Sequence, residues 1–200
     1  MTLTSFKQSV TNNSNRFQSM LVGNTAYTTA FESIATVTAT SGATSLSFNN
    51  IPSTYSHLQI RGIYRDTGGA AVVANMIIQF NSDTSANYSW HRIESTNATS
   101  VTSSGATSQT YGLCAAFGGQ NATTANTFGA GIINIMDYSL NTKYKTIFNM
   151  GGIDNNTTGT VAPSSGLWLN TGIITSITIK PGNVGFALGT TFALYGIKGA

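Results

Sequence analysis

The run Tyr88-Ser89-Trp90-His91-Arg92 has the residue types of a binding site more than any other part of the sequence. With Glu94 two positions further on, it combines aromatic rings, an imidazole, a guanidinium and a carboxylate. Aromatic rings that stack on a sugar face would make this a glycan-binding tip. The alternative is a strand in which Trp90 packs inward while His91 and Arg92 face solvent or a partner subunit. We favour the strand and keep Trp90, His91 and Arg92 as candidates for contact with a ligand or a subunit.

Two aspartates also have a spacing that could support chemistry. Asp66 and Asp83 flank the ends of neighbouring predicted strands, where carboxylates and loop carbonyls could bind a hard cation, although aspartates that cap turns are far commoner. The chain has only six acidic residues and two histidines, and no pair stands out for glycoside hydrolysis. The sequence motifs of zinc proteases, serine hydrolases and nucleotide-binding loops are absent as well. We therefore expect no enzymatic activity, no cofactor and no metal ion.

Cys114 is the single cysteine, so no disulfide can form within the chain. It lies in the apolar run Leu113 to Phe117, where a buried small hydrophobic role is expected. The net charge is +3, and the basic residues are scattered instead of forming the patch typical of nucleic-acid binders. No run of apolar residues has the length of a transmembrane helix, and the N-terminus lacks the apolar region of a signal peptide. We expect neither nucleic acid nor membrane as a direct partner.

The residues from Phe31 onward predict a succession of short strands that would position these side chains. Polar and apolar residues alternate in His57 to Asp66, Val73 to Asn81 and Lys143 to Met150. In the last of these, Tyr144, Thr146 and Phe148 lie opposite Lys145, Ile147 and Asn149. Further strands are expected at Ala43 to Phe48, Tyr88 to Ile93, Thr110 to Gly118, Phe128 to Tyr138, Leu167 to Leu169, Ile173 to Lys180 and Phe192 to Lys198. About ten or eleven strands at this spacing predict an all-β fold, an antiparallel β-sandwich of jelly-roll type.

Two polar segments interrupt this pattern. Ser95 to Gln109 is low in complexity and uncharged, which predicts a long exposed loop or a protruding hairpin. Asp154 to Ser165 contains Pro163 and several turn formers, and we expect turns there because proline is disfavoured in a central strand.

Residues 1–28 differ from the rest of the chain and predict an N-terminal arm before a β-sandwich domain at residues 29–200. The segment is polar, with isolated apolar anchors at Phe6, Val10, Phe17, Met20 and Leu21. It is either a flexible terminus or an extended arm that lies on a neighbouring subunit and buries these anchors there. Both interpretations stay open, and the five anchors are the candidate partner-binding residues.

The composition favours a role in assembly. Charged residues make up 8% of the 200 residues, against roughly 25% in an average soluble domain. The chain has 31 Thr, 22 Ser, 19 Asn and 21 Gly, which favour strands and turns over helices. Because so few charges repel other copies or resist burial, a surface of this kind suits dense packing of subunits.

The segment Phe48 to Asp66, FNNIPSTYSHLQIRGIYRD, resembles structural proteins of tailed-phage virions, of the kind found in cyanophages and other phages of aquatic bacteria. The run Phe80 to His91, FNSDTSANYSWH, and the ending Phe192 to Lys198, FALYGIK, support the resemblance. Together these segments span most of residues 20–200. Proteins of this type are capsid decoration (cement) proteins or tail-fibre components with a β-sandwich domain.

The resemblance implies a virion protein, and the shape of the chain favours one of its two locations. A fibre protein carries a long shaft before its tip, whereas here a single domain follows a short arm. We expect a cement protein that binds the major capsid protein across capsomers on the capsid exterior after assembly in the bacterial cytoplasm. The resemblance implies a homotrimer, since cement proteins commonly form trimers. The alternative is a tail-fibre or receptor-binding tip domain that recognises a host surface glycan.

Overall fold

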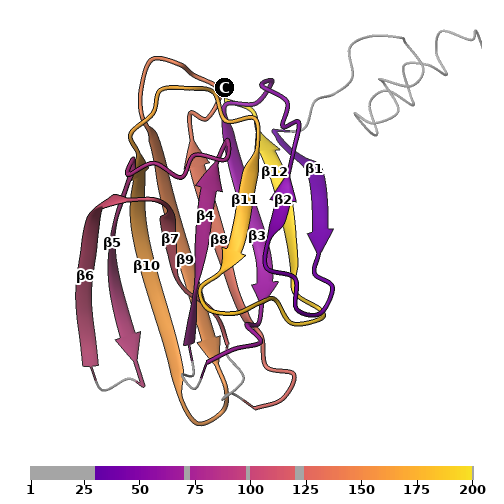
Figure 1. Cartoon of the computed structure of the whole chain (residues 1–200), viewed down its shortest axis with the longest axis vertical. Coiled ribbons are helices and arrows are strands. Elements are labelled where there is room, and N and C mark those ends of the chain that lie inside the picture. Colours follow the sequence, from indigo (N-terminus) through magenta and orange to yellow (C-terminus); the bar gives the residue numbers. More distant parts are fainter. Residues whose placement is uncertain (1–29, 70–72, 98–99, 120–123, 200) are drawn as a thin grey trace, which may run out of the picture.

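The computed structural model describes residues 30–69, 73–97, 100–119 and 124–199, which form twelve strands in two antiparallel sheets. The sheets pack face to face as a β-sandwich, which confirms the expected fold class (Figure 1). The large sheet has eight strands, in the order β1 (Phe31–Thr38), β12 (Thr191–Ile197), β3 (His57–Tyr64), β8 (Gly129–Met136), β9 (Lys145–Asp154), β10 (Gly159–Trp168), β5 (Tyr88–Thr96) and β6 (Ser100–Gln109). The small sheet has the order β2 (Leu46–Phe48), β11 (Ile177–Pro181), β4 (Val73–Phe80) and β7 (Gly112–Gly119).

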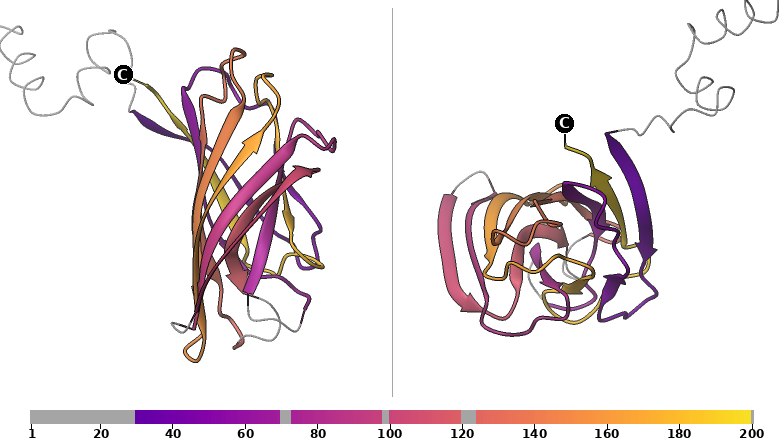
Figure 2. Two further views of the ribbon diagram at one scale, coloured as in Figure 1. Left: turned by 90° about the vertical axis from the view of Figure 1, so that its left-hand side faces the viewer. Right: turned by 90° about the horizontal axis from the view of Figure 1, so that it is seen from above.

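The chain alternates between the two sheets in a simple way. The β5–β6 and β9–β10 hairpins both belong to the large sheet. Without them, the remaining eight strands switch sheets at every step except one, from β4 to β7, which are neighbours in the small sheet. This gives β1-β12-β3-β8 in one sheet and β2-β11-β4-β7 in the other. The two hairpins therefore widen only the large sheet. Figure 2 shows this sheet curving around the small one, with β5 and β6 at the edge opposite β1.

The hydrophobic core fills the space between the sheets. Strands such as β3 and β9 follow the period-two rule, with one face buried in the core and the other facing outward. Three aromatic rings gather at one end, where Phe80 lies 5.4 Å from Trp168 and Tyr88 stacks on Trp168 at 6.3 Å between ring centroids. Such ring pairs stabilise a core beyond the area that they bury.

One glycine in the large sheet is needed for close packing. Gly62 of β3 lies opposite Phe192 of β12. A Cβ atom at Gly62 would lie 2.2 Å from Cδ1 of that ring, so any larger residue would displace it. Gly62 thus allows the Phe192 ring to lie across β3 and fill the core.

The structure agrees with the prediction for one of the two polar segments and differs from the prediction for the other. Of the loop and hairpin expected for Ser95 to Gln109, the structure has the hairpin, formed by β5 and β6. The turns expected for Asp154 to Ser165 are wrong beyond residue 158, because Gly159–Trp168 is a ten-residue strand, β10, between β9 and β5. Pro163 is tolerated because the pairing of β10 with β5 passes from Val161 to Ser164 without including it.

Candidate functional site

The outer face of the large sheet, the side turned away from the small sheet, is the candidate functional site. In β9 the inward residues are buried while Phe148 and Met150 are 50% and 55% exposed. The strand pairings place Ile132 beside Met150, and Met150 beside Pro163. We use the term outer face for the outward residues of β3, β8, β9, β10, β5 and β6, which are Gln59, Arg61, Ile63, Ala130, Ile132, Asn134, Met136, Thr146, Phe148, Met150, Gly152, Asp154, Val161, Pro163, Ser165, Leu167, Ser89, His91, Ile93, Ser95, Val101, Ser103 and Gly105.

This face is apolar and almost free of charge. Within the described part of the chain, its charged side chains are Arg61 in β3 and Asp154 at the end of β9. Arg61 is itself engaged, since its Nε donates a hydrogen bond to Gln59 Oε1 at 2.7 Å and its guanidinium lies 5.1 Å from the Phe31 ring. The area between Arg61 and Asp154 therefore offers apolar and neutral polar contacts only.

Three open hollows lie along the outer face. The central hollow has a volume of about 870 Å³, with Ile63, Ile132, Met150 and Val161 around it. Three glycines of β8 and β9 also line it, at positions 131, 151 and 152. The absence of side chains there lets another surface approach the sheet closely.

The second hollow lies toward β6 and has a volume of about 500 Å³. Phe148, Pro163, Ile93 and His91 line it. The His91 ring lies close against β6 at Gly105, where a Cβ atom would be only 2.4 Å from His91 Cδ2. The absence of a side chain at Gly105 makes this approach possible. This hollow is therefore bounded by an aromatic ring, an imidazole and aliphatic atoms, together with serines of β6 and β10 and Arg92.

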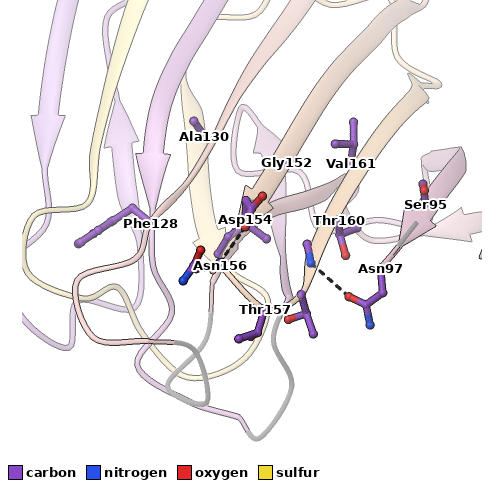
Figure 3. A pocket seen from close by; sticks show the side chains of 13 residues that line it. Ser95, Asn97, Phe128, Ala130, Gly152, Asp154, Asn156, Thr157, Thr160 and Val161 are labelled. Atoms are coloured by element: carbon purple, nitrogen blue, oxygen red, sulfur yellow. Dashed lines mark hydrogen bonds between the residues drawn. The ribbon is translucent and has the colours of Figure 1, made fainter. Parts of the chain in front are cut away.

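The third hollow, about 760 Å³, lies at the end of the face where β9 and β10 meet (Figure 3). Figure 3 shows Phe128 on one side and Asn97 on the other, with Asp154 between them. Asp154 Oδ1 accepts a hydrogen bond from the Asn156 backbone N–H at 2.8 Å, and Asn97 Oδ1 accepts one from Gly159 N–H at 3.2 Å. This end of the outer face offers a carboxylate, amides and an aromatic ring to a polar partner.

Trp90, His91 and Arg92 are not brought together on one side of the sheet. They occupy consecutive positions of β5, so His91 points to the outer face while Trp90 and Arg92 point to the opposite side. Arg92 lies 5.9 Å from the Trp90 ring, and Trp90 Nε1 is buried without a hydrogen-bond partner among the described residues. Of the three candidates, only His91 contributes its side chain to the outer face.

Arg92 belongs to a network that holds β5, β6 and β4 together. Its guanidinium forms an ion pair with Glu94 at 3.1 Å and donates hydrogen bonds to Ser104 Oγ at 2.9 Å and Asn75 Oδ1 at 3.2 Å. The Arg92 side chain therefore has three partners within the fold, in strands of both sheets.

Asp66 and Asp83 cap turns at opposite ends of the sandwich. They follow β3 and β4, which run in opposite directions in Figure 1. Asp66 is fully buried and accepts hydrogen bonds from Tyr64 OH at 2.8 Å, Gly68 N at 2.8 Å, Asn183 N at 3.1 Å and Val184 N at 3.3 Å. It thereby ties the end of β3 to the loop between β11 and β12.

Asp83 holds the other end of the sandwich. Its carboxylate accepts hydrogen bonds from Ser85 N at 2.9 Å, Asn87 Nδ2 at 3.0 Å and Trp168 Nε1 at 2.8 Å. Burial raises the pKa of this carboxyl, but these hydrogen bonds favour the charged form and lower the pKa to about 2. Among the residues that the structure describes, no group of three or more His, Cys, Asp or Glu side chains could hold a metal ion.

Lys145 has a role that the sequence did not reveal. The side chain is fully buried, and its Nζ donates hydrogen bonds to the backbone oxygens of Leu140, Lys143 and Thr171, the last two at 3.1 and 3.0 Å. Burial lowers the pKa of Lys145; the charge of Asp137 opposes this shift, and the charge of Lys143 adds to it. Alternation in Lys143 to Met150 placed Lys145 with Ile147, which is the only signal that could have indicated burial.

Cys114 is fully buried in the core, and burial raises the pKa of its thiol. The arm residues Phe6, Val10, Phe17, Met20 and Leu21 lie outside the described residues. In the part of the chain that the structure covers, no helix has the length and apolarity needed to cross a membrane.

Comparisons with known proteins leave the function to be inferred from the chain itself. No family model, no curated protein and no solved structure matches it.

Proposed function

We propose that the chain is a structural protein of a tailed-phage virion, a cement protein that binds across neighbouring capsomers and stabilises the head. Its partners in this role are the major capsid protein and other copies of the chain, as a homotrimer on the capsid exterior. The role needs no catalytic group, cofactor, metal ion, nucleic acid or membrane.

The outer face of the large sheet is the observation that carries the proposal. A soluble monomer seldom exposes an apolar patch larger than about 300–600 Å², and larger patches mark interaction surfaces. The central and second hollows lie side by side on this face, and large side chains such as Phe148 and Met150 stand exposed between them. A face of this composition is suited to lasting contact with other proteins.

Two further arguments support the proposal. The sequence resemblance to virion structural proteins spans most of residues 20–200. The eight strands that remain after removal of the two hairpins have the order β1-β12-β3-β8 in one sheet and β2-β11-β4-β7 in the other. We interpret this arrangement as a jelly roll, a double-sheet architecture used by many capsid proteins.

The mechanism of stabilisation in this proposal is the sum of many weak contacts. Burying about 400 Å² of apolar surface at one boundary contributes about 10 kcal/mol. Association costs an estimated 4–15 kcal/mol of translational and rotational freedom. The net free energy of a single contact is therefore close to zero. A homotrimer that engages three boundaries at once binds more tightly, because its second and third contacts form within a complex that the first contact has already assembled.

Imaging of reconstituted capsids tests the role. Purified protein is added to capsids of the phage that lack it, and the mixture is imaged by cryo-electron microscopy. We expect regular extra density at local threefold positions of the capsid. Bare capsids, with the protein bound only to tails, would overturn the cement role.

The alternative function is a receptor-binding tip on a tail fibre, and the third hollow is the observation that favours it. Asp154, Asn97 and Phe128 are the residue types that bind sugars, through hydrogen bonds to hydroxyl groups and stacking on the ring. Binding of the chain to surface polysaccharide of the host, lost in Asp154→Ala but kept in Asp137→Ala, is the result that would support this alternative.

A further inference from the structure

The outer face carries a large share of the exposed apolar side chains. Of the fifteen large apolar side chains that are exposed in the described part of the chain, eight lie on it. They are Ile63, Ile93, Val101, Ile132, Met136, Phe148, Met150 and Val161, with exposures from 39% to 71%. Together they present an area on the order of several hundred Å², approaching the roughly 800 Å² that each partner buries in a stable protein–protein contact.

These side chains form continuous rows across the sheet. One row crosses from Arg61 through Ile132 and Met150 to Pro163. The next runs from Ile63 through Ala130, Gly152, Val161 and Ser95 to Val101. The rows span six strands, so the apolar surface is one patch instead of scattered residues.

The same face carries both protruding side chains and hollows that could receive them. Phe148 and Met150 stand half exposed, while glycines 131, 151 and 152 line the neighbouring hollow of about 870 Å³. On a surface that has both protrusions and hollows, the protrusions of one copy can pack against the hollow of the next, and such head-to-tail contacts can close into a ring.

Charge also favours a second copy over a different partner. Between Arg61 at one side and Asp154 at one end, the described outer face has no charged side chain. Burying two such faces removes few charges from water, and Arg61, which borders the central hollow, keeps its hydrogen bond to Gln59 and its place over the Phe31 ring. A partner with a strongly charged surface would find only Arg61 and Asp154 to pair with on the described outer face.

We propose that copies of this chain associate through the outer face of the large sheet, with Phe148 and Met150 of one copy packing against the glycine-lined hollow of the next. The inference rests on the homo-oligomer of the proposed function and adds the surface that builds it. It commits to the folded domain of a second copy, and not the N-terminal arm, as the occupant of the central hollow.

The test is the oligomeric state of the purified full-length chain without capsids, measured by light scattering and sedimentation velocity. We expect an oligomer with a dissociation constant in the micromolar range or tighter, as contacts of this area have. Met150→Asp should raise that constant at least about thirtyfold, the effect of a central interface residue. The milder Met150→Ser should weaken association in the same direction, and circular dichroism checks that both variants fold.

Two control variants give the result its specificity. Leu188→Asp changes the 70% exposed Leu188, outside the outer face, and should leave the dissociation constant unchanged. Phe17→Ser with Met20→Ser alters the arm in the full chain and should also leave it unchanged. A monomeric unaltered chain, an oligomer insensitive to both Met150 variants, or an oligomer lost only in the arm variant would overturn the inference. Because no capsid is present, each of these results is distinct from a failure to bind capsids.

Discussion

Lys145 shows how a single residue can hold two loops against a sheet. Its three hydrogen bonds join the turn before β9, through Leu140 and Lys143, to the segment after β10, through Thr171. We expect Lys145→Met to lower the free energy of unfolding by about 2–4 kcal/mol, because three backbone oxygens lose their donor inside the protein. Urea denaturation followed by fluorescence measures this change.

Lys143→Met is the matched control for Lys145. The Lys143 side chain is 56% exposed and pairs with Asp137 at 2.6 Å. Exposed pairs contribute less than about 1 kcal/mol, so its loss should change stability little. Equal effects in the two variants would show that the buried ammonium has no special role.

Asp83 should make stability depend on pH in the acid range. Its folded-state pKa of about 2 is below the ordinary value of about 3.9. The charged form therefore stabilises the folded state above pH 4, and this contribution is lost as pH falls from about 4 toward 2. We expect Asp83→Asn to remove a contribution on the order of 1 kcal/mol at neutral pH, and to flatten the acid limb of the stability curve.

The Asp83 prediction is tested by the difference in the free energy of unfolding between Asp83→Asn and the unaltered chain, measured at a series of pH values. Hydrogen bonds from Lys198 to Glu32 and from Lys143 to Asp137 lower the pKa of these carboxyls too, so the unaltered chain has several sources of acid sensitivity. Asp154→Asn, at an exposed position, controls for the loss of a carboxylate as such. If the difference in the free energy of unfolding between Asp83→Asn and the unaltered chain stayed constant from pH 6 to about 2, the lowered pKa of Asp83 would be contradicted.

At the scale of elements, β6 is the least supported strand of the large sheet. It pairs only with β5, and most of its residues are exposed on both faces. The opposite edge strand, β1, is held by stacking of Phe31 on Tyr195 at 4.9 Å and by hydrogen bonds from Tyr55 and Lys198 to Glu32.

We expect the backbone amides of β6 to exchange with deuterium at least about tenfold faster than those of β1, and faster still than those of the central strands β8 and β9. The measurement is hydrogen exchange followed by mass spectrometry, made on Met150→Asp so that association adds no protection. Protection of β6 equal to that of β8 would mean that its edge is covered.

The sequence predicts the elements well where one face of a strand is buried. The alternation in His57 to Asp66 and Val73 to Asn81 corresponds to β3 and β4. β6 has no such alternation because both of its faces are exposed, and its serines and threonines are equally typical of loops. Only the end of β10 was expected, within the strand at Leu167 to Leu169. The rest was missed because its glycines, serines and Pro163 predict turns, and only the neighbours β9 and β5 hold it extended.

The candidate site was less predictable than the fold. Alternation placed Phe148 on one side of its strand and Lys145 on the other, but it could not tell which side faces the core. The rows across the outer face depend on strand order, since residues 61, 132, 150 and 163 are far apart in the sequence. Short-range patterns carry no information about such pairings.

At the scale of the whole molecule, the scarcity of charge should govern how association responds to salt. The outer face relies on apolar contacts, which ions do not screen. We expect the dissociation constant of the oligomer to change less than about threefold between low salt and about 0.5 M NaCl, measured by sedimentation equilibrium. Association that weakens tenfold or more over this range would indicate ion pairs that the outer face does not have.

The two ends of the described chain meet at one corner of the large sheet. β1 begins where β12 ends, and the Lys198 N–H donates a hydrogen bond to the Ala30 carbonyl at 3.0 Å (Figure 2). A force that pulls these two ends apart separates β1 from β12, beginning at the pair Phe31 and Ile197. The hydrogen bonds between the two strands then break one after another. The same force applied across the outer face is shared among many strands. Tension between the two ends of the domain would therefore detach β1 from β12 before it disturbed the core.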